Sequence, residues 1–356
     1  MSPDPFADGE ALVCAVSVTP RPDRDRNEDA AVPVHAPRAG VSGVAVADGL
    51  GSYARAGEAA RFAAHRAASW LHGQAAPVDG DALARLFAGV HADLRAHARE
   101  LAGGDDPPEQ THGTTLLVGV DAGAELLAAY AGNGAVWHLR GNFGAYPAAG
   151  LPHNAVNLLN PHSVMLGGRE VLYNLVDAAA AHPPAPAVVS IAKDPVHGDL
   201  LVVCTDGIYS ADQLTYGTDA GGTLWVSAEA TMATLFHALR DLFAAWDGEG
   251  APPLEEALRD CLEGMRARGM LEDDATVGVI VTADALRHQR AARARSTAGI
   301  GVGPRISAGA AADGEDGGRE AEEARPRGEG DAEDNVVETA AAREDGGCTA
   351  SPASRA

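Results

Sequence analysis

The alternation of apolar and polar positions divides the first 286 residues into blocks of predicted strands and helices. Three β-type runs come first, and two Ala-rich stretches with apolar residues at every third or fourth position follow them. The strands are expected at residues 11–18, 29–36 and 41–48, and the helices at residues 57–72 and 81–101. The chain therefore opens with a block of strands and continues with a pair of amphipathic helices.

The same two blocks recur in the second part of the chain. Gly-containing turns separate three short apolar runs, and a buried strand, two helices and a closing strand come later. These strands are expected at 111–122, 125–132, 135–141, 199–208 and 274–283, and the helices at 228–246 and 253–268. The segment 142–198 allows no assignment. Strands and helices in blocks, without strict alternation, predict an α+β fold of mainly antiparallel sheets covered by helices.

The composition changes near Leu286. Beyond it lie an Arg-rich segment and then a stretch of Gly, Ala, Glu and Asp without any aromatic residue. Such a stretch buries too little apolar surface to offset the entropy lost on ordering. We therefore expect an N-terminal arm at 1–10, one folded domain at 11–286 and a disordered, acidic and Arg-containing tail at 287–356.

An excess of acidic residues narrows the range of partners. The 356 residues include 27 Lys and Arg against 50 Asp and Glu, which gives a formal net charge of −23. This surface would repel a nucleic acid, and no apolar run reaches the ~18–20 residues that a membrane helix needs. Acidic residues at the N-terminus, where a secretory signal would be basic, predict a cytoplasmic protein. The four cysteines form no CxxC pair, which argues against both a zinc site and a disulfide framework.

Acidic residues stand at the ends of three predicted strands. Asp48 and Asp206 each close an apolar run and are followed by glycine, and Asp273 with Asp274 precedes the last strand. Turn chemistry explains any single one of them, because Asp-Gly is a common hairpin dipeptide. Carboxylates at several strand ends can also converge at one edge of a sheet sandwich, where a divalent cation relieves their repulsion.

A further charged group precedes the second strand, in the segment RPDRDRNEDAAV. Glu28 and Asp29 follow three arginines there, Arg21, Arg24 and Arg26. One interpretation is a solvated loop. The other is an anion site beside a cation site, because guanidinium groups bind phosphate oxygens while carboxylates hold a metal ion. That combination suits phosphoryl chemistry.

Five short motifs follow one another along residues 10–283. They are R-x-x-NED at 24–29, VADGLGS-x4-GE at 46–58, GTTL at 113–116, CTDG at 204–207 and DDATVGVIV at 273–281. With these motifs in this order, the chain resembles a bacterial form of the metal-dependent type 2C (PPM) serine/threonine protein phosphatases. The resemblance implies an αββα sandwich of two packed antiparallel sheets flanked by helix pairs, with metal ions in a cleft at one edge.

The resemblance also implies a metal-binding role for four strand-end positions. Asp48 matches the carboxylate that bridges two Mn2+ or Mg2+ ions, and the carbonyl of Gly49 would bind one of them. Asp206 and Asp273 match ligands of the other ion.

The loop before the second strand matches the rest of the family's site. Glu28 and Asp29 correspond to its acidic pair, which also belongs to the metal site, and Glu28 is expected to act directly or through metal-bound water. Arg24 lies where the family places its phosphate-binding arginine; Arg26 is nearer to the acidic pair, but the spacing favours Arg24. Two cations would lower the pKa of a shared water that attacks phosphorus in line, with Asp48 and Arg24 as the expected catalytic residues.

Some positions depart from the family's pattern. Where the family has GDSR or GDG, this chain reads AGNGAV, so that Asn133 replaces an aspartate. An amide binds a divalent cation more weakly than a carboxylate does, so a third ion is expected to bind weakly or not at all. Leu50 stands where some relatives have a histidine, and His112 could replace that proton donor only if it faces the cleft. Packing within a strand is the favoured explanation of the two threonines of GTTL.

The expected activity is metal-dependent hydrolysis of phosphoserine and phosphothreonine in phosphoproteins. Beside the phosphoprotein substrate, a cognate serine/threonine kinase or its targets are candidate partners. The alternative is a pseudophosphatase that binds phosphoproteins without turnover, and Asn133 is its main support. Retention of Arg24, Asp48, Asp206 and Asp273 speaks against this alternative. An ATP-dependent enzyme is disfavoured, because the chain has no G-x4-GK sequence.

Overall fold

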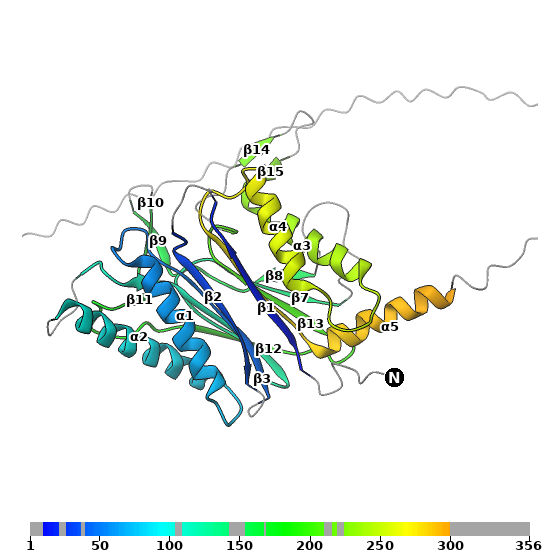
Figure 1. The fold of residues 1–356 in the computed structure, drawn as a ribbon, viewed down its shortest axis with the longest axis horizontal. Helices are drawn as coiled ribbons and strands as arrows, with labels where there is room; N and C mark the ends of the chain where they lie inside the picture. Colours follow the sequence, from blue (N-terminus) through cyan, green and yellow to red (C-terminus); the bar gives the residue numbers. More distant parts are fainter. Residues whose placement is uncertain are drawn as a thin grey trace, which may run out of the picture. The chain divides into compact units, whose positions relative to one another are not determined.

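Two five-stranded antiparallel sheets form the centre of the described part of the protein (Figure 1). The computed structural model describes residues 10–20, 26–36, 40–103, 109–141, 154–166, 169–209, 216–218 and 224–299, all of which fall in the unit Met1–Gly303. The predicted α+β class is correct, and most of the predicted elements begin and end within one or two residues of the observed ones.

The first sheet contains the N-terminal strand and the last one. Its order is β1 (Leu12–Val18), β16 (Ala275–Val281), β13 (Asp199–Cys204), β7 (Ala135–Arg140) and β8 (Ala155–Asn157). The helices α3 (Ser227–Ala245) and α4 (Leu254–Ala267) cover its outer face, where Phe236, Phe243 and Trp246 are buried against it.

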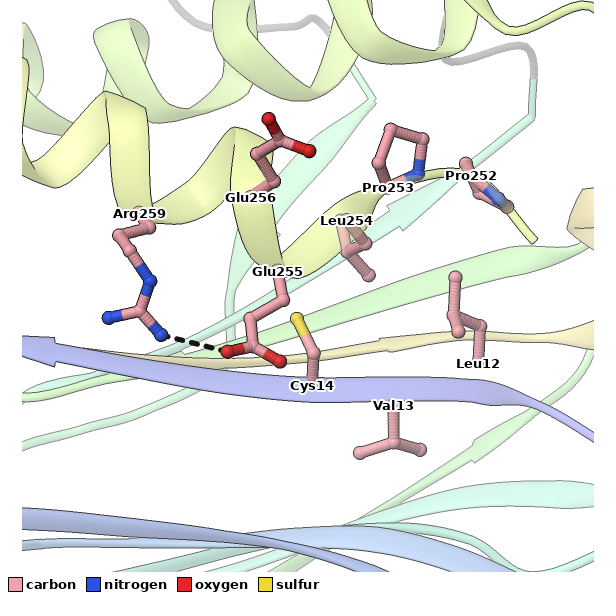
Figure 2. A pocket seen from close by; sticks show the side chains of 9 residues that line it. All are labelled: Leu12, Val13, Cys14, Pro252, Pro253, Leu254, Glu255, Glu256 and Arg259. Carbon is pink, nitrogen blue, oxygen red and sulfur yellow. Dashed lines mark hydrogen bonds and ion pairs between the residues drawn. The ribbon is translucent and has the colours of Figure 1, made fainter.

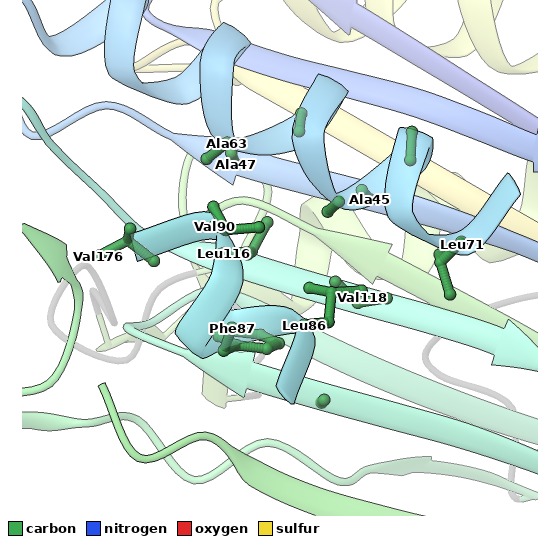
Figure 3. Packing of buried hydrophobic residues seen from close by; sticks show 14 of the residues in the cluster. Ala45, Ala47, Ala63, Leu71, Leu86, Phe87, Val90, Leu116, Val118 and Val176 are labelled. Carbon is green, nitrogen blue, oxygen red and sulfur yellow. The ribbon is translucent and has the colours of Figure 1, made fainter. Parts of the chain in front are cut away.

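The second sheet has the order β12 (Ala187–Ala192), β6 (Glu125–Ala131), β5 (Leu116–Asp121), β3 (Val41–Asp48) and β2 (Asp29–Ala36). The helices α1 (Ala56–His72) and α2 (Gly80–Ala102) pack on it, as Figure 3 shows for Ala63, Leu71 and Phe87. The buried face of α1 is mostly alanine, which lets the helix approach the sheet closely. At the start of α2, the side chain of Asp79 caps the helix by accepting a hydrogen bond from the backbone N–H of Ala82 at 2.7 Å.

The two sheets pack face to face through a third apolar cluster. Val44, Leu117, Leu201 and Ile280 are fully buried in it and come from β3, β5, β13 and β16. These central strands carry continuous apolar runs because one face meets the opposite sheet and the other face meets a helix pair. The result is the αββα sandwich that the family resemblance implies.

Short strands occupy the segment that allowed no assignment from the sequence. They include β8 and β12, the hairpin of β9 (Ser163–Leu166) with β10 (Arg169–Leu172), and β11 (Val176–Asp177), which pairs with β4 (Gly113–Thr114). A second small hairpin joins β14 (Tyr216–Thr218) to β15 (Leu224–Val226). The strands of two to four residues among them are too short to give a clear apolar period in the sequence.

The C-terminal boundary differs from the predicted one. A helix, α5 (Ala283–Gly299), runs through residue 286, and Leu286 and Gln289 are buried on it. Farther along, the guanidinium of Arg290 lies 5.8 Å from the ring centre of Trp246. Composition alone missed this helix because part of its packing comes from Arg290, a residue type that composition counts as solvated but whose planar head lies over an aromatic ring. The remainder of the predicted tail, 300–356, and most of the predicted arm, 1–9, lie outside the described residues.

Candidate metal centre

Two candidate ligands face each other across neighbouring strands of the second sheet. Asp29 begins β2 and Asp48 ends β3, and the antiparallel register pairs them directly. Burial raises the pKa of Asp29 to about 8, and the charge of Asp206 adds to that rise. Burial also raises the pKa of Asp48 well above its ordinary value, and repulsion from Asp29 and Asp206 raises it further. The carboxyl groups of Asp29, Asp48 and Asp206 therefore lie close together in a poorly solvated site.

Asp206 reaches this place from the other sheet, directly after the end of β13. Its Oδ2 accepts a hydrogen bond from Nδ2 of Asn133 at 2.8 Å. The preceding residue, Thr205, donates a hydrogen bond from Oγ1 to Oδ2 of Asp29 at 2.8 Å. The carboxylate cluster of Asp29, Asp48 and Asp206 therefore joins the two sheets at one edge of the sandwich.

The backbone of residues 273–274 runs against the glycine that follows Asp206. A Cβ on Gly207 would lie 2.0 Å from the carbonyl oxygen of Asp274 and 3.3 Å from the carbonyl carbon of Asp273. Only glycine fits such an approach. Asp274, which is 3% exposed, accepts a hydrogen bond from the backbone N–H of Glu28 at 2.8 Å. This contact ties the loop of the acidic pair to the strand that carries Asp273.

Gly49 and two threonines hold the backbone around Asp48. A Cβ on Gly49 would lie 2.4 Å from the backbone of Ala56, and the N–H of Gly49 donates to the carbonyl of Glu28 at 3.1 Å. Thr114 Oγ1 donates to the carbonyl oxygen of Asp48 at 2.8 Å, and Thr115 Oγ1 accepts from its N–H at 3.0 Å. Packing alone therefore does not explain the threonines of GTTL, because their hydroxyl groups position Asp48.

The donor set fits a hard divalent cation. Asp29 is only 5% exposed, and its Oδ1 is buried without a hydrogen-bond donor. A buried carboxylate oxygen without a donor costs free energy, and so does the mutual repulsion of three carboxyl groups. Carboxylate oxygens are the ligands that Mn2+ and Mg2+ prefer, and an ion among them removes both costs.

A cavity of about 420 Å3 opens beside the acidic pair. Glu28 lines it together with Arg26, Arg55, Glu58 and Arg61. Three guanidinium groups around one opening suit an anionic group. The arginine that the family spacing favours, Arg24, lies outside the described residues.

Another cavity, of about 500 Å3, lies on the other side of the first sheet, between β1 and the start of α4 (Figure 2). Cys14 points into it beside Leu12 and Leu254. Burial raises the pKa of the Cys14 thiol to about 12, so the thiol stays protonated at neutral pH. Cys14 is therefore not a candidate nucleophile.

Sequence reasoning missed one group of side chains. Glu58, His97 and His112 bring a carboxylate and two imidazoles to within 4.8 Å of one another. The ring of His112 is buried and faces Glu58 and His97. Their spacing along the chain follows no metal-binding motif, so the sequence held no signal for the group.

No helix in the described ranges is both long and apolar enough to cross a bilayer. A comparison with curated proteins found no match. Among solved structures, the serine/threonine phosphatase of S. agalactiae is similar with a TM-score of 0.52 and 17% identity, over 76% of this chain and 98% of that one. The phosphatase Stp1 from Staphylococcus aureus is similar with a TM-score of 0.52 and 13% identity, over 76% of this chain and 94% of that one.

The catalytic domain of the serine/threonine protein phosphatase PstP, solved in complex with two manganese ions, is similar with a TM-score of 0.50 and 18% identity, over 76% of this chain and 98% of that one. At these identities the likeness concerns the fold. The family model described as protein phosphatase 2C matches residues 22–263, well over half of the chain. The chain therefore belongs to the protein phosphatase 2C family of serine/threonine protein phosphatases.

Proposed function

We propose that the protein hydrolyses phosphoserine and phosphothreonine in phosphoproteins with the help of two Mn2+ or Mg2+ ions. The observation that carries this proposal is the convergence of Asp29, Asp48 and Asp206 from two sheets, with the pKa values of Asp29 and Asp48 raised by burial and mutual repulsion. The PstP structure, which holds two manganese ions, supports the choice of metal.

The carboxylate cluster and its neighbours would hold the two ions. Asp48, the carbonyl of Gly49, Asp206 and Asp273 would supply the ligand oxygens, and Glu28 and Asp29 would complete the acidic side. When bound, the ions lower the pKa of water and neutralise the charge that develops on a phosphoryl group.

The arginine-lined cavity binds and orients the substrate. The phosphoryl group enters beside Glu28, where Arg26 lines the cavity wall. Arg24, two residues earlier, is the phosphate-binding and catalytic arginine of this proposal. Guanidinium groups bind the phosphoryl oxygens and so orient the phosphorus for in-line attack by water. Because water attacks the phosphorus directly, no covalent phosphoenzyme is needed. The substrates are phosphoproteins in the cytoplasm. A cognate serine/threonine kinase would phosphorylate the signalling proteins that this enzyme dephosphorylates.

The test is release of p-nitrophenol from p-nitrophenyl phosphate with and without Mn2+. Asp48→Asn and Asp206→Asn are expected to lower kcat by at least about 100-fold, because each removes a charged ligand. Asp93→Asn is the matched control: it neutralises a carboxylate that is 44% exposed and paired with Arg66. Full metal-dependent activity in Asp48→Asn would refute the proposal.

One observation favours a second function, that of a phosphoprotein-binding pseudophosphatase. Asn133 stands in place of an acidic residue and uses its amide to hold Asp206. In this alternative, a phosphopeptide binds without turnover at any Mn2+ concentration. The same wild-type assay, run beside a phosphopeptide-binding measurement, separates the two functions.

A further inference from the structure

Three side chains from separate elements meet beside α1, next to the candidate metal centre. Glu58 lies in the first turn of α1, His97 on α2, and His112 just before β4. Nε2 of His97 is 2.9 Å from Oε1 of Glu58, and Nε2 of His112 is 4.0 Å from Oε2. The packing of α1 on α2 and the sheet thus sets one carboxylate against two imidazoles.

The buried imidazole has an unsatisfied nitrogen. His112 is 2% exposed, and its Nε2 is buried without a hydrogen-bond partner. Burial lowers the pKa of His112, which favours the neutral ring. We assign the hydrogen of that ring to Nδ1, which lies 3.2 Å from Oγ1 of Thr111. The lone pair of Nε2 then faces the Glu58 carboxylate, an arrangement that a cation stabilises.

We propose that Glu58, His97 and His112 bind a divalent transition-metal ion, with Zn2+ as the preferred ion, at a site separate from the carboxylate cluster. Two imidazoles and one carboxylate, with water in a fourth position, form a common zinc ligand set. The absence of a CxxC pair argues only against a zinc site with cysteine ligands, and the proposed site has none.

The distances allow this coordination with a small movement. Ligand atoms about 2.0–2.2 Å from one zinc ion lie roughly 3–4 Å from one another. The three candidate atoms already lie within 4.8 Å of one another. The side chain of Glu58 is 33% exposed and can shift to close the remaining gap once its pairing with Arg55 loosens. Phe62 stacks on the His97 ring, with the ring centres 4.8 Å apart, and holds that ring in place.

The ligand types separate this site from the carboxylate cluster. Imidazole nitrogen favours Zn2+, Co2+ and similar ions, whereas an all-oxygen set suits Mg2+ and Mn2+. Excess Mg2+ therefore occupies the cluster and leaves the histidine site open. The proposal does not depend on the protein being an active phosphatase.

Arg55 competes with the ion for Glu58. Its Nη1 lies 2.9 Å from Oε2 of Glu58, the oxygen nearest to His112, and the Arg55 side chain is 48% exposed. A bound ion must share this carboxylate with the guanidinium or displace it. Removing the guanidinium is therefore expected to strengthen metal binding.

The experiment uses the full chain, stripped of metal, saturated with Mg2+ and titrated with Co2+ as a spectroscopic probe. Co2+ in a low-coordinate site with imidazole ligands absorbs visible light more strongly than six-coordinate Co2+ with oxygen ligands. We expect one absorbing Co2+ per chain, displaced by one Zn2+. His97→Ala should weaken Co2+ binding at least about tenfold, because replacing a residue that only hydrogen-bonds to a metal ligand already lowers metal affinity by about that factor. Arg55→Gln should strengthen it.

The controls keep the outcome unambiguous. His65→Ala removes an exposed histidine on α1 and should leave the titration unchanged. His97 is partly exposed, so its variant should fold, and circular dichroism melting verifies this. The proposal is overturned if His97→Ala titrates like the wild type, as expected for a mere Glu58–His97 ion pair. It is also overturned if Asp48→Asn abolishes the band while His97→Ala keeps it.

Discussion

At the scale of single residues, hydroxyl and amide groups decide how the acidic side chains are held. Thr205 Oγ1 donates to Asp29, and the same oxygen accepts the backbone N–H of Thr276 at 3.0 Å. Asn133 is 8% exposed and donates to Asp206. These contacts partly relieve the repulsion within the cluster, because a neutral donor stabilises a carboxylate without adding charge.

Replacing Asn133 by Asp introduces the residue type that the family resemblance implies for this position. Without metal, we expect a lower Tm than in the wild type, because the new carboxylate loses the donated hydrogen bond and repels Asp206. With Mn2+, we expect a larger rise in Tm than the wild type shows, because tighter binding to the folded state stabilises it more. Differential scanning calorimetry with and without Mn2+ measures both effects.

The matched control for this change is Asn133→Ala, which removes the hydrogen bond and adds no charge. It should lower the Tm without metal and leave the Mn2+-induced rise no larger than in the wild type. If Asn133→Asp behaves like Asn133→Ala in both conditions, position 133 does not face a bound ion.

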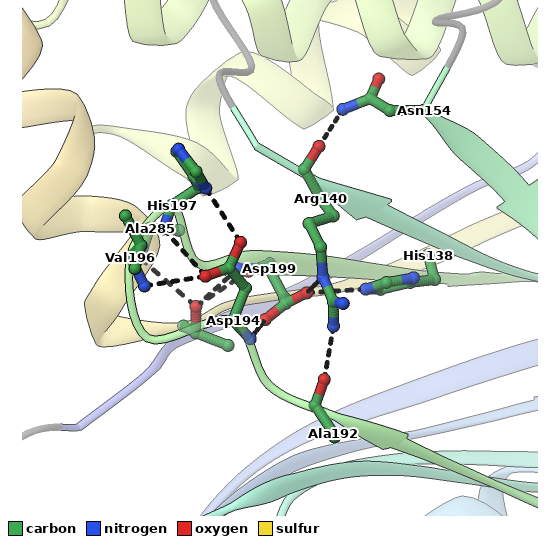
Figure 4. Close-up of polar contacts among 10 residues, drawn as sticks. His138, Arg140, Asn154, Ala192, Asp194, Val196, His197, Asp199 and Ala285 are labelled. Carbon is green, nitrogen blue, oxygen red and sulfur yellow. Dashed lines mark hydrogen bonds and ion pairs between the residues drawn. The ribbon is translucent and has the colours of Figure 1, made fainter.

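At the scale of elements, β13 connects the candidate site to a polar network at its other end. Asp199 begins the strand and is fully buried, and its Oδ1 lies 2.8 Å from both Nε of Arg140 and Nε2 of His138 (Figure 4). Its Oδ2 accepts the backbone N–H of Asp194 at 2.6 Å. Burial would raise the pKa of Asp199, but these hydrogen bonds hold it below its ordinary value. The network anchors the strand that delivers Asp206.

Asp199→Asn is expected to lower the free energy of unfolding by about 2 kcal/mol at neutral pH. Both carboxylate oxygens accept hydrogen bonds, whereas an amide has one acceptor oxygen. Urea unfolding followed by circular dichroism measures the change. The exposed Asp241→Asn, at a side chain 68% exposed, serves as the control and should change stability little.

The stabilising effect of Asp199 depends on pH with a definite sign. Because its folded pKa is lowered, the stability it supplies is present above the unfolded pKa of about 3.9 and is lost as pH falls through the folded value. The difference in stability between wild type and Asp199→Asn should therefore shrink below about pH 4. A difference that stays constant from pH 7 to pH 3 would contradict this account.

At the scale of the whole sandwich, small residues set the distance between the sheets. A Cβ on Gly278 would lie 2.4 Å from Cγ2 of Val44, and one on Gly119 would lie 3.0 Å from Leu201. This spacing matters for the site, because the carboxylates of the cluster come from both sheets and meet only if the sheets approach closely.

Gly278→Ala is expected to destabilise the protein by about 1–3 kcal/mol through overpacking against Val44. The double variant Gly278→Ala with Val44→Ala should recover part of that loss, because it removes the methyl groups that clash. A double-mutant cycle from urea unfolding measures the coupling. Strictly additive effects would show that the two side chains do not meet across the sheets.

Local patterns in the sequence predict most of the elements, the class of fold and the candidate acidic residues. Apolar periods are local, so β3, β16 and the paired helices could be predicted within a residue or two, whereas β13 begins where predicted but ends four residues earlier. The order of the motifs predicted the type 2C phosphatase family, and the match to the family model confirms it. The roles of the individual site residues stay predictions until the variants are measured.

Which of these groups meet depends on tertiary packing. Asp29 and Thr205 are separated by 176 positions, and no local pattern records that one donates to the other. The raised pKa of Asp29 likewise depends on burial that its neighbours in sequence do not report. Glu58, His97 and His112 come together for the same reason, since the packing of helices on a sheet places side chains whose spacing along the chain carries no signal.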